Sequence, residues 1–164
     1  MESNRYVMAF ENFDQATEPV KAELTPPETI EKIWKVIDSG DFFCIISSYS
    51  PGNDPDVIDS EHQALQREVL RRKYAYLEQS FGYRYSDGHG LTSIRGKSLF
   101  VPVMSYKELL SLGKKYDQET VVFGGNGKMD VLRVSDESIL KTFDTRELKL
   151  AWNLLLTNPR NIPW

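Results

Sequence analysis

The chain has 164 residues, of which 40% are hydrophobic, 27% charged and 12% aromatic, and its formal net charge is −4. This length and composition suffice for a buried core, which excludes a disordered chain and one that needs metals or disulfides to fold. The single cysteine, Cys44, excludes an internal disulfide and a cysteine-only zinc site. No apolar run reaches the roughly 18 residues that span a bilayer, and residues 1–5 do not resemble a signal peptide. We therefore expect a cytoplasmic protein with no membrane partner.

The charge is unevenly distributed along the chain. Residues 1–61 hold 4 basic and 13 acidic side chains, residues 62–97 hold 7 and 3, and residues 98–164 hold 9 and 8. Two interpretations stay open. The basic middle faces an anionic ligand, or it pairs with the acidic front on the surface, where ion pairs contribute little.

The predicted elements begin with an acidic segment, residues 1–24, whose apolar run at 6–10 indicates an arm or an edge strand. Thr25, Pro26 and Glu28 have the spacing of a helix start, with Thr25 as the N-cap. An apolar stripe at helical spacing follows, made of Ile30, Ile33, Trp34 and Ile37. The pattern predicts a helix that ends at Ser39 and Gly40.

A continuous apolar run at 42–46 then predicts a strand that is buried on both faces and central in its sheet. A loop at 47–56 leads to a second helix, predicted to start at Asp59 or Ser60 and to run to about Ser80. Its inward residues are expected to be Leu65, Val69, Leu70 and Leu77.

The period changes to that of a strand after residue 80, because Tyr83 and Tyr85 alternate with Arg84, and 87–90 is typical of a turn. A strand at 98–104 follows, which Pro102 should confine to an edge or a bulge. Ser105 is the expected N-cap of a short helix that buries Leu109, Leu110 and Leu112 and ends near Gly113 or the pair Lys114 and Lys115.

The last third predicts a hairpin over 120–134 with a turn at 124–127, then a strand over 138–143. Asp144 or Thr145 should cap a final helix that carries Leu148, Ala151, Trp152 and Leu155. This order of elements indicates the α+β class: one domain over residues 25–164, with a mixed, mostly antiparallel sheet and helices packed on it.

Three motifs are excluded as sites. Residues 90–98 resemble a phosphate-binding loop, but five residues separate the glycines instead of four, and a strand follows instead of a helix. Cys44 lies in an apolar strand, where a thiol stays unreactive. His62 and His89 lack a second ligand at metal spacing, so we expect no metal and no cofactor.

A first ligand-binding segment is predicted directly after the buried strand. The residues there are Ser47, Ser48, Tyr49 and Ser50. Polar groups beyond the carboxyl end of a strand commonly bind ligands, but hydroxyls there can also cap the next helix or bond loop backbone. Both interpretations stay open.

A second ligand-binding region is predicted in the basic middle of the chain. Arg67 and Arg71 are one helical turn apart, and Arg84, His89, Arg95 and Lys97 follow in the hairpin region. If the hairpin folds back over the helix, these groups converge on a surface suited to a phosphate, a nucleotide or a single strand. The alternative is a solvated helix face.

Residues 46–51 resemble the segment of one strand followed by Thr-Ala-aromatic-Asn-Pro in a family of small bacterial and phage proteins, domain of unknown function 3293. The spacing to 60–80, to 96–101 and to 115–122 is also similar, so the resemblance covers about 41–123. Ser50 stands where the family has Asn. The resemblance implies a small cytoplasmic α/β domain, encoded on bacterial or phage DNA, with polar loops after the first core strand. It implies no particular activity.

Three functions follow from these observations. The first is a non-catalytic binding or regulatory protein that takes an anionic small molecule, a nucleotide or a protein partner. The second is an enzyme acting on a phosphorylated or nucleotide substrate, with His62, His89 or Glu61 as acid or base. The third is a protein-interaction module that uses the acidic segment 1–24, in which case deleting that segment breaks the complex. Because no nucleophile stands beside a base in the sequence, a binding role is favoured over an enzyme.

Overall fold

The computed structural model describes residues 16–18, 27–48, 54–86 and 91–150. Within them the helices are α2 (Pro27–Asp38), α3 (Pro55–Arg71) and α4 (Tyr106–Lys115), and residues 145–150 are also helical. The strands are β1 (Ala16–Glu18), β2 (Phe43–Ile46), β3 (Leu77–Ser86), β4 (Leu91–Pro102), β5 (Thr120–Gly125), β6 (Lys128–Arg133) and β7 (Ile139–Asp144).

These strands form one seven-stranded sheet in the order β1-β3-β4-β2-β5-β6-β7, and each neighbouring pair in the described residues is antiparallel. The α+β class and the antiparallel character of the sheet are therefore confirmed. The prediction for β2 is confirmed for four of its five residues: Phe43–Ile46 are buried, and β2 lies in the middle of the sheet between β4 and β5. Phe42 was wrongly included, because it precedes the strand and is 45% exposed.

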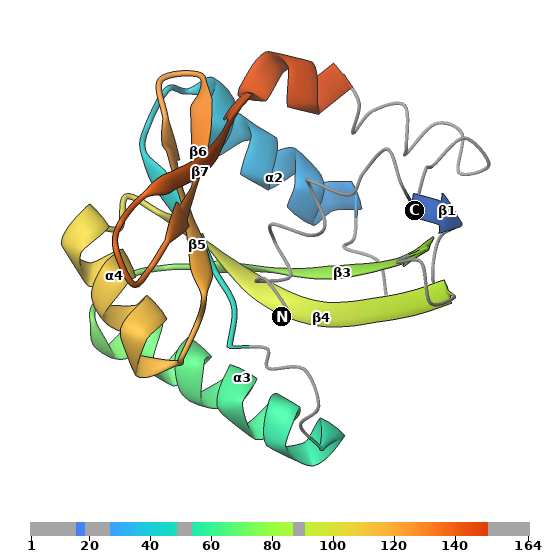
Figure 1. Cartoon of the computed structure of the whole chain (residues 1–164). Coiled ribbons are helices and arrows are strands. Elements are labelled where there is room, and N and C mark those ends of the chain that lie inside the picture. The colour runs from blue at the N-terminus through green and yellow to red at the C-terminus, as the bar shows by residue number, and fades with distance from the viewer. Residues whose placement is uncertain (1–15, 19–26, 49–53, 87–90, 151–164) are drawn as a thin grey trace.

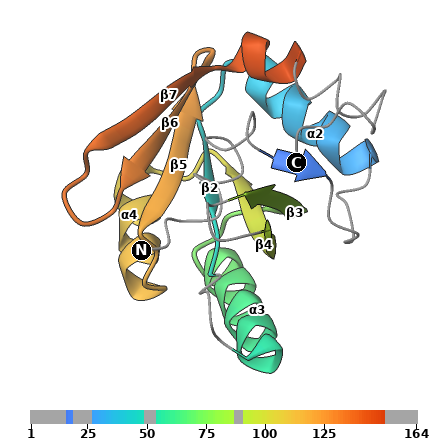
Figure 2. The same cartoon turned by 45° about the vertical axis from the view of Figure 1, so that its right-hand side comes forward.

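The sheet separates two cores. Helix α2 lies on one face, and α3 and α4 lie on the other (Figures 1 and 2). Because successive strand residues point to opposite faces, Phe43 and Ile45 of β2 pack with the predicted apolar stripe of α2. Cys44 and Ile46 instead pack on the opposite face, in the cluster that includes Leu65 from α3.

The second helix differs from its prediction at both ends. Asp54 caps it, because its Oδ1 accepts a hydrogen bond from the Asp56 N–H at 2.8 Å, so α3 starts at Pro55. It ends at Arg71, because Lys73 adopts a left-handed backbone conformation with a φ of 71°. The prediction that the helix continues to Ser80 is wrong, and residues from Leu77 onward pair with β4 instead.

The inward face of that helix was also predicted with one error. Leu65 and Val69 are fully buried, whereas Leu70 is 54% exposed. Residues four apart share one face of a helix, so a stripe through Leu65 and Val69 leaves Leu70 to the side. Leu77, the fourth predicted inward residue, belongs to β3 and packs against the core on the α2 side.

The position of Pro102 corrects another prediction. Strand β4 lies inside the sheet and starts at Leu91, seven residues before the predicted start at 98. Pro102 is its last residue, where it pairs with Phe43. A proline can end an interior strand because its missing N–H falls at the end of the ladder.

The remaining predictions in the second half of the chain are confirmed where the structure describes them. Ser105 caps α4, the turn between β5 and β6 has φ angles of 52° at Asn126 and 80° at Gly127, and β7 follows. Asp144 caps the last helix by accepting from the Arg146 N–H at 2.8 Å. The predicted features at 6–10, Thr25, Pro26 and 151–155 lie outside the described residues.

Candidate functional site

The first predicted ligand segment leaves β2 at the point where the buried apolar strand becomes polar. Ser47 and Ser48 are both buried. The Ser47 hydroxyl donates a hydrogen bond to the backbone carbonyl of Lys97 at 2.9 Å, which ties the end of β2 to β4. The other two residues of the segment, Tyr49 and Ser50, lie outside the described residues. The structure therefore joins two predicted site residues, Ser47 and Lys97, through the backbone of β4.

The side of α3 that faces the sheet is apolar toward the end of the helix and polar closer to its start. Val69 and Leu65 are apolar and buried, and one turn earlier the same side carries His62, which is 6% exposed. A histidine in a core position needs hydrogen-bond partners, because burying an unpaired polar group is costly.

The partner of His62 comes from β3. Its Nε2 lies 2.8 Å from Oε2 of Glu78, and the Gln66 side-chain amide donates to the same oxygen at 2.7 Å. The Lys97 ammonium lies 3.8 Å from the other oxygen of Glu78. We call His62, Gln66, Glu78 and Lys97 the His62 cluster. It joins one helix and two strands around a half-exposed carboxylate.

One ring atom of the His62 cluster has no hydrogen-bond partner among the residues that the structure describes. This atom is His62 Nδ1, which is buried. Leaving a buried polar atom without a partner costs about 1–3 kcal/mol, so such atoms are rare in native proteins and commonly mark a catalytic group or a place for a water or ligand. The His62 cluster is therefore the candidate site.

A second polar network lies further along α3, toward α4. Glu68 is 8% exposed and accepts hydrogen bonds from Arg71, Arg72 and Lys115. The hydrogen bonds from Arg71 and Arg72 are the main causes that lower the pKa of Glu68 to about 2. We call Glu68, Arg71, Arg72 and Lys115 the Glu68 cluster. Through it α3 is bound to the end of α4.

Two of the basic residues predicted to converge, Arg71 and Lys97, lie in different clusters. Arg71 pairs with Glu68, and Lys97 pairs with Glu78, so different carboxylates hold them. Arg67 is exposed on α3. Arg84 lies in β3 and Arg95 in β4, where the register aligns Arg84 with Ser93 and Gly82 with Arg95. His89 lies outside the described residues, and whether these residues bind a ligand stays a prediction.

Glu78 and Gln66 were missing from the sequence-based site. Gln66 follows His62 by four residues on a helix, which is a usable signal. Glu78 could not be found in this way, because the sequence pattern assigned it to the wrong element.

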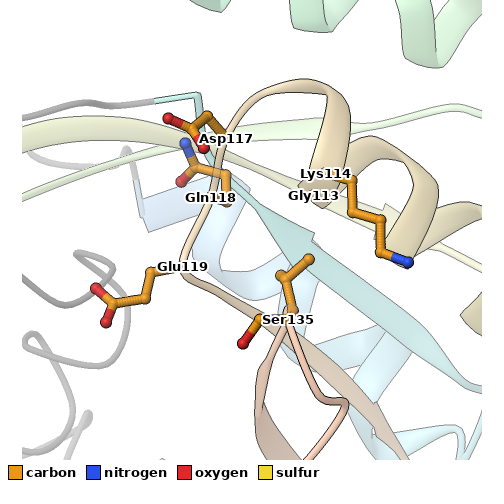
Figure 3. A pocket seen from close by; sticks show the side chains of 7 residues that line it. Gly113, Lys114, Asp117, Gln118, Glu119 and Ser135 are labelled. Atoms are coloured by element: carbon orange, nitrogen blue, oxygen red, sulfur yellow. The ribbon is translucent and has the colours of Figure 1, made fainter.

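A separate pocket of about 400 Å³ lies between the end of α4 and the turn after β6 (Figure 3). Its lining comprises Gly113, Lys114, Asp117, Gln118, Glu119, Val134 and Ser135. In Figure 3 the Lys114 amine points away from the Asp117 carboxylate, and the side chains of Glu119 and Ser135 point toward neither of these two groups. Because these polar groups do not converge, the pocket does not resemble a built ligand site.

Cys44 donates a hydrogen bond from Sγ to the Met104 carbonyl, and burial raises its pKa, which disfavours a reactive thiolate. In the part of the chain that the structure describes, no group of three or more His, Cys, Asp or Glu side chains is arranged to hold a metal ion. No helix among the described residues is long and apolar enough to cross a membrane.

The sequence matches no protein-family model, and a search of curated proteins finds no match. A search of solved structures finds a phage SAM lyase in complex with S-methyl-5'-thioadenosine, at 10% identity. The similarity covers 63% of this chain and 88% of that chain, with a TM-score of 0.26. A likeness at this level carries no argument about the function of the chain.

Proposed function

We propose that the protein binds a small polar ligand at the His62 cluster. The observation that carries this proposal is the buried Nδ1 of His62, which has no hydrogen-bond partner in the described part of the chain although Nε2 of the same ring is bonded to Glu78. A bound ligand would supply the missing hydrogen bond. The nearby Lys97 ammonium is 42% exposed and can contact an acceptor on the same ligand.

The test is a titration of the labelled protein, followed by amide NMR, with phosphate, AMP, ATP, adenosine and a short single-stranded DNA. We expect at least one of these compounds to shift the signals of His62, Glu78 and Lys97. The variant His62→Gln should weaken that binding at least about tenfold, the factor that 1.4 kcal/mol represents. Gln63→Ala is the matched control, because Gln63 is exposed on the same helix.

The predicted basic surface around Arg67 and Arg71 is a competing location for an anionic ligand, and the same titration separates the two. The double substitution Arg67→Glu with Arg71→Glu should abolish binding if the ligand lies on that surface. If binding survives His62→Gln and is lost in the double variant, the proposed site at His62 is wrong.

The pairing of His62 with Glu78 also favours a second candidate function, acid–base catalysis on a phosphorylated or nucleotide substrate. A carboxylate that orients an imidazole is a common arrangement for a general base. Among the three predicted acid–base residues, His62 has such a carboxylate, and Glu61 is exposed. Turnover with a bell-shaped pH dependence that His62→Gln abolishes would support catalysis, and binding without turnover would support the first function.

A further inference from the structure

We propose that the His62 cluster selects its ligand through a hydrogen-bond donor, so that the group facing Nδ1 is an uncharged or cationic O–H or N–H and not an anion. This inference rests on the proposed function, which it deepens by naming the chemistry of the ligand group. Three features of the cluster lead to it.

The first feature is the tautomer of His62. A carboxylate accepts hydrogen bonds, so Nε2, which lies 2.8 Å from Glu78, is the ring nitrogen that can donate there. We assign the single hydrogen of the ring to Nε2 as part of this proposal, which leaves a lone pair on Nδ1 and makes that atom an acceptor. A ligand group that is itself an acceptor would place two lone pairs against each other.

The second feature is how firmly the Glu78 carboxylate is held. Gln66 donates to the same oxygen that His62 contacts, at 2.7 Å, and Lys97 lies beside the other oxygen. Because His62 and Gln66 are one turn apart on α3, the helix sets the distance between the two donors. The ring orientation, and with it the direction of the Nδ1 lone pair, is therefore fixed by three neighbouring side chains.

The third feature is the charge around the site. The first turns of α3 carry the exposed carboxylates of Asp56, Asp59 and Glu61, and Glu78 lies inside the cluster. Lys97 is the cation that the structure pairs with Glu78. Like charges repel at short range, so the Glu78 carboxylate bonded to the same ring opposes an anionic group at Nδ1 and tolerates a neutral or cationic one.

The test uses pairs of small compounds that differ in one donor or one charge: phenol and anisole, indole and 1-methylindole, acetamide and acetate. Each is added at millimolar concentration to the full-length protein, and the two ring nitrogens of His62 are followed by long-range proton–nitrogen NMR. We expect the first compound of a pair to shift Nδ1 while Nε2 stays nearly unchanged. The second compound should bind at least about tenfold more weakly, because it leaves the buried acceptor unpaired.

The substitution Glu78→Gln gives a second, independent readout. A glutamine can donate as well as accept, so it no longer fixes the hydrogen on Nε2, and the preference for donors should shrink toward onefold. Gln63→Ala should keep the full preference, since Gln63 is exposed and belongs to neither end of the His62–Glu78 hydrogen bond.

Three results would overturn the inference: equal binding of the two members of the pairs, tighter binding of acetate than of acetamide, or no shift of Nδ1 with any compound. The last result includes the case of a tightly held water that none of the compounds displaces. If the nucleotide panel nevertheless binds in a manner that depends on His62, the proposed function survives and the donor requirement alone is wrong.

Discussion

The two polar clusters on α3 differ in how completely their groups are bonded. In the Glu68 cluster a buried carboxylate accepts hydrogen bonds from three cations, two of which extend into solvent. In the His62 cluster the carboxylate is half-exposed, and the buried Nδ1 of His62 has no hydrogen-bond partner among the described residues. A fully bonded network stabilises the packing of two helices, whereas a buried polar atom without a partner lowers the stability of the fold. This difference supports a structural role for Glu68 and underlies the ligand binding that we propose for His62.

The largest expected effect is the loss of stability on removing the carboxylate of the Glu68 cluster. Glu68→Ala should lower the free energy of unfolding by about 2–3 kcal/mol, because Arg72, which is mostly buried, loses the nearer of its two carboxylate partners. Glu78→Ala should cost less, about 1–2 kcal/mol, because Glu78 is 37% exposed but its removal leaves the buried Nε2 of His62 unpaired. Urea denaturation measures both, and Glu61→Ala serves as the exposed control. Equal losses in the free energy of unfolding would show that the Glu68 cluster does not stabilise the fold more than the His62 cluster.

The pH dependence of stability should follow from Glu68 as well. Its pKa of about 2 in the folded protein lies below the ordinary value of 4.5, so the unfolded chain binds its proton more readily. The contribution is therefore complete above about pH 5 and is lost as the pH falls toward 2. Unfolding curves recorded between pH 2 and 7 should show this loss in the natural protein and a smaller one in Glu68→Gln. Identical pH profiles would show that the cations do not stabilise the ionised form.

A smaller effect is expected at Tyr74, which extends the Glu68 cluster. Its hydroxyl donates to Glu108, a carboxylate that Arg72 also approaches, and this hydrogen bond is the main cause that raises the pKa of Tyr74. Tyr74→Phe should lower the free energy of unfolding by about 1 kcal/mol, the typical value of one such bond. Thermal denaturation measures it, with Tyr76→Phe as the comparison. If Tyr76→Phe costs as much, the hydrogen bond to Glu108 is not the cause.

How far the sequence predicted this structure depends on the range of the interactions involved. The buried run that became β2, the stripe of α2 and the cap at Ser105 were recognisable because neighbours along the chain decide them. The end of α3 was not, because Leu77 fits the helical period as well as a strand, and pairing with Phe100 of β4 decides between them.

The His62 cluster could not be predicted from the sequence for the same reason. His62 was recognised as an acid–base candidate, but its partner Glu78 is 16 residues away and lies on a strand that the pattern had assigned to a helix. The prediction of a basic surface was incomplete in a similar way, because it did not consider the carboxylates that pair with Arg71 and Lys97. Glu68 precedes Arg71 and Arg72 by three and four residues at the end of the same helix, and that pairing was predictable.

The smallest effect on stability is expected where the proposed effect on function is largest. His62→Leu removes the hydrogen bond to Glu78, but it also removes the buried Nδ1, which none of the described residues bonds, and it extends the apolar side of α3 formed by Leu65 and Val69. These contributions oppose each other, so the free energy of unfolding should stay within about 1 kcal/mol of that of the natural protein. Ligand binding should be lost in the same variant. A loss of stability as large as that of Glu68→Ala would show instead that His62 is a structural residue whose Nδ1 is already bonded, for instance to a held water, and the ligand site would have to be sought elsewhere.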